Sequence, residues 1–243
     1  MSLYRDRGVV LRTVKLGEAD RIVSLLTPAH GKVRAVAKGV RRTKSRFGGR
    51  LEPLSHVELM CWQGRELDVV TQVEVIDSFR PVRQDLARTA KAAAMLEVAD
   101  QASQERQAAP ELYAVLVGAL RTLAARDSPL LLAGYLLKVL ALEGASPVLE
   151  HCARCGAGGE LVAFDLAEGG ALCRSCRRGA AVGPEALGLM RQILGGELAR
   201  ALAQPAGPAA EQVESLAVAA VEAHLERGLR AVRSLRSLRQ VTG

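Results

Sequence analysis

The sequence contains none of the common motifs that bind phosphate or supply a catalytic nucleophile. The patterns GxxxxGK[ST], GxGxxG and GxSxG are all absent. Their absence argues against a nucleotide hydrolase, a dinucleotide-dependent enzyme and a serine hydrolase. The carboxylates of Glu18 and Asp20 lie close in sequence but have no metal-ligating histidine beside them, so we interpret them as strand-entry or salt-bridge residues. We therefore expect a protein that is not an enzyme.

Long apolar runs are also lacking. The most hydrophobic stretch, residues 130–142, is interrupted by Lys138 and is shorter than the roughly 20 residues that a membrane-spanning helix needs. The first ten residues carry Arg5, Asp6 and Arg7 where a secretory leader would be apolar. We expect a cytoplasmic, nucleoid-associated protein with no membrane contact.

Positive charge is concentrated at the start of the chain. The net charge is +7, but residues 1–50 alone hold 13 Lys and Arg against 3 acidic residues, and the remainder is slightly acidic. The stretch from residue 31 to residue 50 contains no carboxylate. Its basic residues are Lys32, Arg34, Lys38, Arg41, Arg42, Lys44, Arg46 and Arg50. A basic front on a near-neutral body indicates a binding module for a polyanion, and a nucleic-acid backbone is the first candidate. A solvated loop that serves only solubility is the alternative.

Aromatic residues make up only 3% of the chain. Phe47, between Arg46 and two glycines, is the candidate that could stack on a base, whereas Trp62 and Phe79 end predicted strands and are expected in the core. With so few stacking platforms, binding would depend on the phosphate backbone, be sensitive to salt and read little sequence. The predicted DNA-binding residues are Lys32, Arg34, Lys38, Arg41, Arg42, Lys44, Arg46 and Phe47.

Residues 1–80 are predicted to form a small β-barrel domain. Five β-rich segments with turn signals between them lie at residues 8–14, 21–27, 32–37, 56–62 and 68–79. No helical pattern among them is long enough for a βαβ unit, so a five-stranded barrel is the economical fold. The pattern does not separate an oligonucleotide-binding (OB) fold from an SH3-like barrel.

Residues 81–243 are predicted to form a helical domain, which makes the chain an α+β protein of two domains. The expected helices span residues 85–104, 110–125, 128–144, 184–194 and 211–239. The last is predicted as one long helix with an apolar stripe (Leu225, Leu229, Val232, Leu235, Leu238) and a row of arginines (Arg227, Arg230, Arg233, Arg236, Arg239). The arginines are interpreted as a solvated face, with contact to nucleic acid or a partner as the alternative.

Two CxxC pairs are embedded in the helical domain, in a module at about residues 148–180. They are Cys152 with Cys155 and Cys173 with Cys176, separated by 17 residues, which is the spacing of structural zinc sites. Four thiolates would complete a tetrahedral shell around one Zn²⁺ and leave no open position for a catalytic water. The HxE pattern at residues 56–58 matches part of the zinc-deaminase motif, but it lies far from the cysteines and no proline precedes either pair. Cys61 is expected to be a small core residue.

These features together resemble the RecO family of bacterial DNA-repair and recombination-mediator proteins. The resemblance rests on residues 8–11 (GVVL), 17–23 (GEADRIV), 31–39 (GKVRAVAKG), 41–46 (RRTKSR), 51–53 (LEP) and 152–156 (CARCG), with Gly169 and Gly170 before Cys173. It covers the first 80 residues and, more loosely, the helical body. Residues 195–243 match poorly, and Thr43 stands where the family usually has proline.

The resemblance implies an OB-fold followed by a helical domain with a zinc module. It further implies binding to single- and double-stranded DNA, annealing of complementary strands, and cooperation with RecR in loading RecA onto strands covered by single-strand DNA-binding protein. Lys38, Arg41, Arg42, Lys44 and Arg46 would contact phosphates by their position in the matching stretch. The alternative function is a protein-interaction adaptor whose basic barrel binds an acidic tail of a partner.

Overall fold

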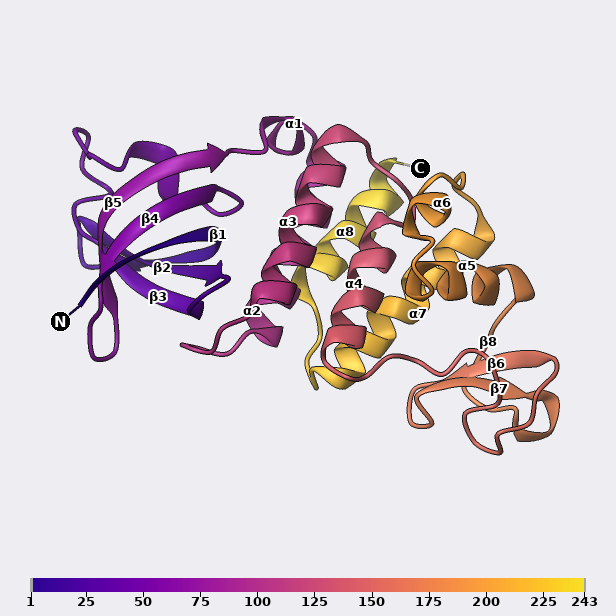
Figure 1. Ribbon diagram of the computed structural model, residues 1–243. Helices are drawn as coiled ribbons and strands as arrows, with labels where there is room; N and C mark the ends of the chain where they lie inside the picture. Colours follow the sequence, from indigo (N-terminus) through magenta and orange to yellow (C-terminus); the bar gives the residue numbers. More distant parts are fainter. Residues whose placement is uncertain (1, 243) are drawn as a thin grey trace. The chain divides into compact units, whose positions relative to one another are not determined.

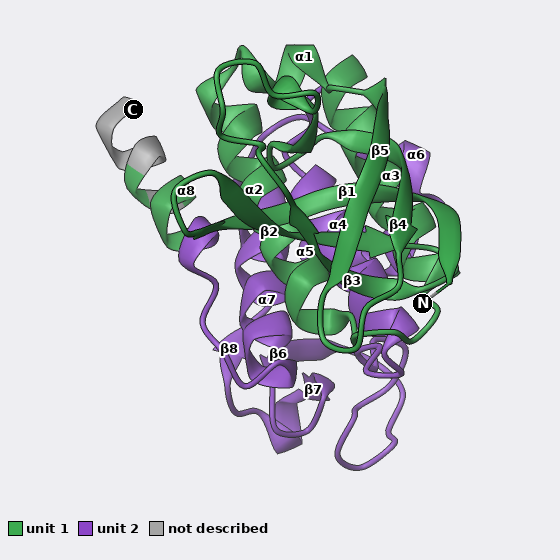
Figure 2. Ribbon diagram, turned by 90° about the vertical axis from the view of Figure 1, so that its left-hand side faces the viewer, with its two compact units in different colours: residues 1–125, 233–243 green, residues 126–232 purple. Residues whose placement is uncertain are grey.

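A computed structural model describes residues 2–242 of the chain, with the side chains of residue 236 and residues 238–242 outside the described part. The chain divides into two units, drawn in different colours in Figure 2. The first comprises residues 1–125 and 233–243, and the second comprises residues 126–232. No helix within the described residues has both the length and the apolar character needed to cross a bilayer.

Five strands at the start of the first unit close into a barrel (Figure 1). They are β1 (Leu3–Leu16), β2 (Asp20–Thr27), β3 (Gly31–Ala37), β4 (His56–Trp62) and β5 (Asp68–Asp77). Their order around the barrel is β1-β2-β3-β5-β4, and β1 pairs with both β2 and β4 to close it. The pairing of β3 with β5 is parallel, at Ala35 with Asp68 and Val36 with Val69, whereas the other pairings are antiparallel. This closed arrangement confirms the predicted OB-like fold.

The barrel core is aliphatic, as the scarcity of aromatics requires. Alternation along β3 shows how it forms: Val33, Ala35 and Ala37 are buried, while Arg34 and Val36 between them are only partly buried. The other core side chains come from each of the remaining strands, and Cys61 lies among them, as expected for a small core residue.

Phe47 completes this core from outside the sheet. The connection from β3 to β4 ends in the short 3₁₀ helix η1 (Gly48–Leu51), which places Phe47 and Leu51 in the core with 1% and 2% of their surfaces exposed. The expectation that Phe47 stacks on a base is therefore wrong. Burial of an aromatic ring is the stronger driving force here, because an aliphatic barrel of this size has few large side chains with which to fill its interior.

Three helices complete the described N-terminal part of the first unit. They are α1 (Arg80–Arg83), α2 (Leu86–Ala102) and α3 (Pro110–Ala125). Asp85 caps α2 by accepting a hydrogen bond from the backbone N–H of Arg88. Helices α2 and α3 pack on each other and on strands β1 and β2. The compact unit thus extends beyond residue 80, where the β-rich pattern ends.

The second unit holds four helices and a small sheet. The helices are α4 (Leu131–Leu142), α5 (Pro184–Leu194), α6 (Leu198–Leu202) and α7 (Pro208–His224), and the sheet comprises β6 (Leu161–Asp165), β7 (Gly170–Cys173) and β8 (Ala180–Ala181). Helix α4 is buried along most of its length and packs against α5, α6 and α7. Gly134 permits this packing, because a Cβ at this position would lie 2.9 Å from Leu198 Cδ1.

The prediction of a single long C-terminal helix is wrong. Helix α7 ends at His224 and α8 (Arg230–Thr242) begins six residues later. Glu226 takes a left-handed conformation with φ 50°, and the carboxylate of Glu222 accepts a hydrogen bond from the backbone N–H of Leu229. Gly228 lies within this break and weakens the helix there.

The break between α7 and α8 divides the apolar stripe that the sequence predicts for the C-terminal helix. Leu229, Val232 and Leu235 are buried and Leu225 is partly buried. Arg227, Arg230 and Arg233 are exposed. The side chains of Arg236, Leu238 and Arg239 lie outside the described residues.

Replacement of Phe47 by alanine should open a cavity in the barrel. We expect the free energy of unfolding of the barrel to fall by about 3–5 kcal/mol. Urea unfolding followed by the fluorescence of Trp62, the one tryptophan in the sequence, would measure the loss. Lys44→Ala, an exposed change in the same connection, is the control and should alter stability by no more than ~0.5 kcal/mol. Equal midpoints for the two variants would show that Phe47 does not anchor the connection.

Candidate nucleic-acid interface and metal centre

The basic loop, defined here as residues 38–46, leaves the barrel at the end of β3 and is fixed to the hairpin between β1 and β2. Asp20 Oδ1 accepts a hydrogen bond of 2.7 Å from the backbone N–H of Gly39. Arg41 donates its backbone N–H to Ala19 O at 2.9 Å and a guanidinium N–H to Gly17 O at 3.2 Å. Together with the burial of Phe47, these contacts hold both ends of the loop.

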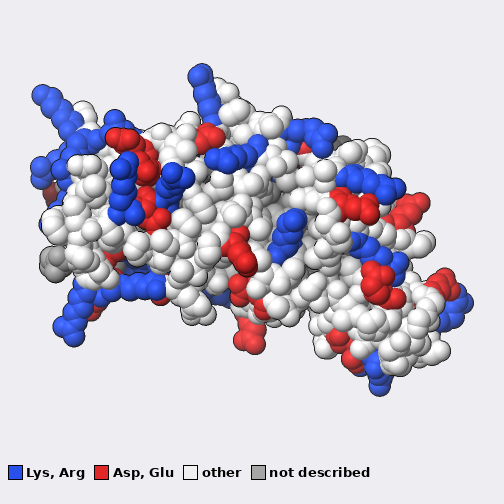
Figure 3. Space-filling view, in the orientation of Figure 1, with Lys and Arg blue, Asp and Glu red and all other residues white. Residues whose placement is uncertain are grey.

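The charges of this loop face solvent. Lys38, Arg41, Arg42, Lys44 and Arg46 are all exposed, as is Arg50 beyond the loop. Figure 3 shows basic side chains projecting from the barrel, on the side of the view where the barrel lies in Figure 1. Within the described part of the chain, no carboxylate forms an ion pair with any of the basic side chains in the loop. A concentrated positive charge without internal compensation attracts a polyanion.

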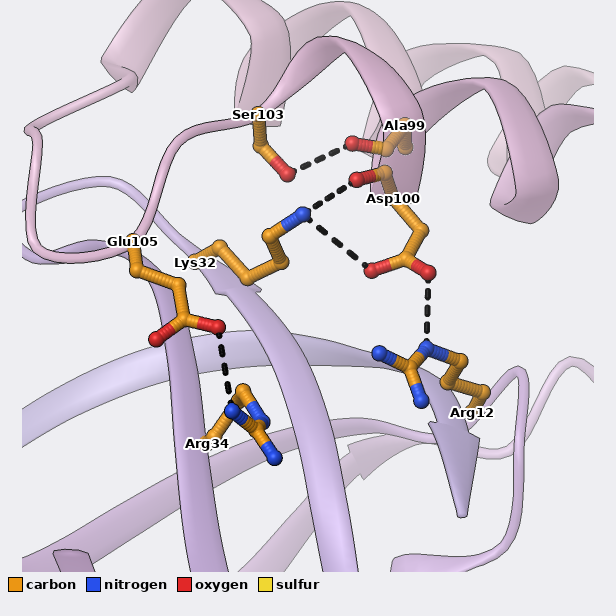
Figure 4. A network of polar contacts seen from close by, with 7 residues as sticks. All are labelled: Arg12, Lys32, Arg34, Ala99, Asp100, Ser103 and Glu105. Carbon is orange, nitrogen blue, oxygen red and sulfur yellow. Dashed lines mark hydrogen bonds and ion pairs between the residues drawn. The ribbon is translucent and has the colours of Figure 1, made fainter. Parts of the chain in front are cut away.

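Lys32 and Arg34 have a different environment from the loop residues. Both lie on β3 and turn toward the C-terminal end of α2 (Figure 4). The Lys32 ammonium donates to the backbone carbonyl of Asp100 and lies 3.5 Å from its Oδ1. Arg34 pairs with Glu105 at 3.4 Å.

Asp100 joins the barrel to α2 through two basic side chains, those of Lys32 and Arg12. Its Oδ2 also accepts a hydrogen bond of 2.7 Å from Arg12 on β1. The Lys32 side chain is 16% exposed and that of Asp100 is 20% exposed, so water screens this pair less than it would screen a surface pair. We infer that Lys32 and Arg34 hold the barrel against α2, and we no longer place them among the phosphate contacts.

Trp62 is exposed, so the prediction that it lies in the core is wrong. Its side chain at the end of β4 is 43% exposed, and it pairs across the sheet with Leu3, which is 45% exposed. Phe79, assigned to the core by the same reasoning, is fully buried. The position of Trp62 next to the polar turn Gln63-Gly64 is the available signal, because connecting segments run over the protein surface.

The two CxxC pairs come together in the second unit. The four sulfur atoms lie within 4.8 Å of one another, and the sulfurs of Cys155 and Cys173 are 3.9 Å apart. The first pair lies in the turn before β6. The second lies at the end of β7 and in the 3₁₀ helix η2 (Arg174–Cys176). A cluster of four cysteines at this separation could hold a metal ion.

Backbone contacts align the two knuckles. Val148 donates its N–H to Gly169 O at 3.0 Å and accepts from Ala171 N at 2.8 Å, while Ala153 N donates to Ala171 O at 2.8 Å. Gly170 is required at this crossing, because a Cβ there would lie 2.3 Å from Val148 O. The glycines before the second pair are therefore part of the frame that brings the cysteines together.

The electrostatics of the cluster fit a cation. Hydrogen bonding from the backbone of Cys173 lowers the pKa of Cys152 below that of an ordinary thiol. Hydrogen bonding with Cys155 raises the pKa of Cys176. One thiolate is thus favoured and a neighbouring one is disfavoured, mainly through these hydrogen bonds and to a smaller extent through repulsion by the charge of Cys152. A metal ion removes this repulsion and allows all four to ionise.

Comparison with protein-family models covers both halves of the chain. Residues 1–79 match the model described as the recombination protein O N-terminal domain, and residues 83–233 match the model of the recombination protein O C-terminal domain. The chain belongs to the recombination protein O (RecO) family. Membership supports a role in DNA recombination and repair. The expectation that the chain matches the family poorly from residue 195 onward is wrong up to residue 233, where the match to the RecO C-terminal model ends.

Replacement of Lys32 should affect stability in a way that replacement of Lys44 does not. Lys32→Met leaves the Asp100 carbonyl without its donor, and we expect the free energy of unfolding to fall by about 1–3 kcal/mol. Lys44→Met, in the exposed loop, should be near neutral. Urea unfolding monitored by Trp62 fluorescence compares the two variants. Indistinguishable midpoints would contradict a structural role for Lys32.

Proposed function

We propose that this protein is a non-enzymatic DNA-binding mediator of recombination and repair. The observation that carries the proposal is the basic loop, whose exposed charges have no carboxylate partners among the described residues and whose two ends are fixed to the barrel. Lys38, Arg41, Arg42, Lys44 and Arg46 would contact phosphates of single- and double-stranded DNA. Contacts of this kind position the protein on the backbone and carry little sequence information.

Annealing of complementary strands follows from the same chemistry. Two DNA strands repel each other, and a protein that neutralises phosphates on both lowers this repulsion without reading bases. By its family membership, we propose that the protein acts with RecR, and with single-strand DNA-binding protein on the covered strand, to help load RecA. No reacting group is needed for these steps.

For the cysteine cluster we propose one structural Zn²⁺. Cys152, Cys155, Cys173 and Cys176 would hold it, and a shell of four thiolates matches the preference of zinc for tetrahedral sulfur coordination. The ion would supply cross-linking alone, because no coordination position remains for a substrate. Its role would be to hold together the two knuckles at the small sheet of the second unit.

Charge reversal in the loop tests DNA binding. For the wild-type protein, about five contacts predict a loss of affinity for a labelled single strand of roughly 100-fold between about 50 and about 200 mM salt. The double variant Arg41→Glu with Arg42→Glu should bind more weakly, and the slope of log affinity against log salt should be shallower by ~1.4. Fluorescence anisotropy with a single strand and with a duplex measures both.

The matched control is the double variant Arg65→Glu with Arg80→Glu, which makes the same change in charge at exposed sites of the same unit. It should retain most of the wild-type affinity. Equal weakening by both double variants would show that only net charge matters and would remove the loop from the proposal. If the wild-type protein binds an acidic peptide but no DNA at low salt, the adaptor is the correct function.

Replacement of one cysteine tests whether the four thiolates bind one zinc ion. Cys155→Ser should purify without the ion, while the wild-type protein carries about one zinc per chain, as measured by inductively coupled plasma mass spectrometry. Hydrogen exchange in residues 148–180 should speed up in the variant, because zinc binding stabilises such modules. His151→Ala, next to the first knuckle, is the control and should keep the metal. A stoichiometric zinc retained by Cys155→Ser would exclude the four-thiolate shell.

A further inference from the structure

A cleft of about 620 Å³ lies in the first unit, separate from the basic loop. Strands β1, β4 and β5 form one side of it and helix α3 forms the other. No residue of the loop lines it. Its size is within the range of about 300–1,000 Å³ that small-ligand sites occupy.

The residues that line the cleft include a buried histidine, one of whose ring nitrogens has no hydrogen-bond partner in the described part of the chain. His56 is 3% exposed, and its Nε2 lies 2.6 Å from the hydroxyl of Tyr113. Its Nδ1 is buried and has no hydrogen-bond partner among the described residues. Burial, followed by the charge of Arg121, lowers the pKa of His56, so the ring is neutral at neutral pH. A ligand with a hydrogen-bonding edge would supply the partner that this nitrogen lacks.

Of the two guanidinium groups at the cleft, that of Arg7 forms one long ion pair and that of Arg121 forms none among the described residues. Glu58 pairs closely with Arg5 and reaches Arg7 only at 4.0 Å. Arg121 has no carboxylate partner in the part of the chain that the structure describes.

The nearby aspartates do not compensate these two arginines. Asp6 pairs with His30 at 2.7 Å, and Asp77 accepts a hydrogen bond from the backbone of Phe79 at 2.7 Å. Glu58 is shared between Arg5 and Arg7, so Arg121 is the cleft residue for which an anionic group on a ligand would be the natural counter-charge.

The α3 side of the cleft is shaped by small residues. Ala114 and Gly118 lie one turn apart, and a Cβ at Gly118 would meet no atom within 4 Å. Across from them, Ile76 is 44% exposed. Apolar walls beside polar groups suit a ligand with a flat, weakly polar ring joined to an anion.

We propose that this cleft binds one nucleotide of a single DNA strand. Arg7 and Arg121 hold its phosphate, the base lies against Ile76 and α3, and the edge of the base bonds with His56 and Tyr113. The proposal rests on the DNA binding proposed above and adds a second contact site to it.

The two sites lie on different parts of the barrel. The loop is bonded to Gly17, just after β1, whereas Arg7 lies ten residues earlier, on the part of β1 that pairs with β4 and not with β2. An annealing protein has to bring two strands together, so separate sites on one unit serve this reaction.

Titration with deoxythymidine monophosphate tests whether the cleft binds a nucleotide. The chain has 4 histidines, so the ring signals of isotope-labelled histidine can be assigned by substitution and followed by NMR. We expect the nucleotide to shift the His56 signals in the full-length protein and to leave them unchanged in Gly118→Leu, which fills the cleft. Inorganic phosphate and thymidine should each give smaller shifts.

Three results would overturn the assignment. The first is an absence of any shift. The second is an equal shift with inorganic phosphate alone, which would indicate a simple anion site. The third is a shift with an acidic peptide but not with the nucleotide, which would make the cleft a protein-docking site.

Annealing kinetics test the role of the site. Gly118→Leu and Arg121→Gln should each slow annealing of two labelled complementary strands about tenfold, while affinity for a duplex stays within about twofold of wild type, since the loop is intact. Arg65→Gln removes the same charge at an exposed position outside both sites and should leave annealing unchanged. Trp62 fluorescence in urea checks that both cleft variants fold.

The outcomes separate this inference from the broader function. A wild-type protein that binds no DNA overturns both. A wild-type protein that binds and anneals DNA, together with cleft variants that anneal at the same rate, overturns the second site alone.

Discussion

Closure of the barrel is the constraint on which the first unit depends. Strand β1 has to pair with β2 and β4 at once, and the connection from β3 to β4 crosses the barrel end. Phe47 and Leu51 enter the core from that connection, so apolar burial fixes its far end. The residues between are then held in a loop that is too polar to fold inward, and their charges remain in solvent.

The same unit uses positive charge in two ways. Arg12 and Lys32 pair with Asp100 near the end of α2, and Arg34 pairs with Glu105 in the connection after α2. The Lys32–Asp100 pair is the most buried of these and contributes most to the fold. The loop residues have no such partners within the described chain, and their charge is available to a ligand. Identical residue types a few positions apart thus serve stability and binding, and the difference lies only in what each side chain meets.

In the second unit, the cysteine cluster lies beside a sheet of three short strands whose buried residues include Phe164, Ala171 and Leu172. Backbone bonds through Val148 and Gly170 bring the two knuckles together, but close thiols resist joint ionisation without a cation. A metal ion held by these four cysteines would couple metal binding to folding, as it does in small metal modules generally.

The sequence by itself determined the five strands, because alternation such as Val33, Ala35 and Ala37 can bury only one face, and it indicated the four cysteines by their spacing. The register of the barrel, the core position of Phe47, the exposure of Trp62 and the break between α7 and α8 were decided by tertiary structure. Each depends on what a residue meets across the fold, which local pattern does not record. The cleft at His56 is the clearest case, since its walls come from strands and a helix distant in sequence, and only their packing leaves a buried nitrogen without a partner among the residues that the structure describes.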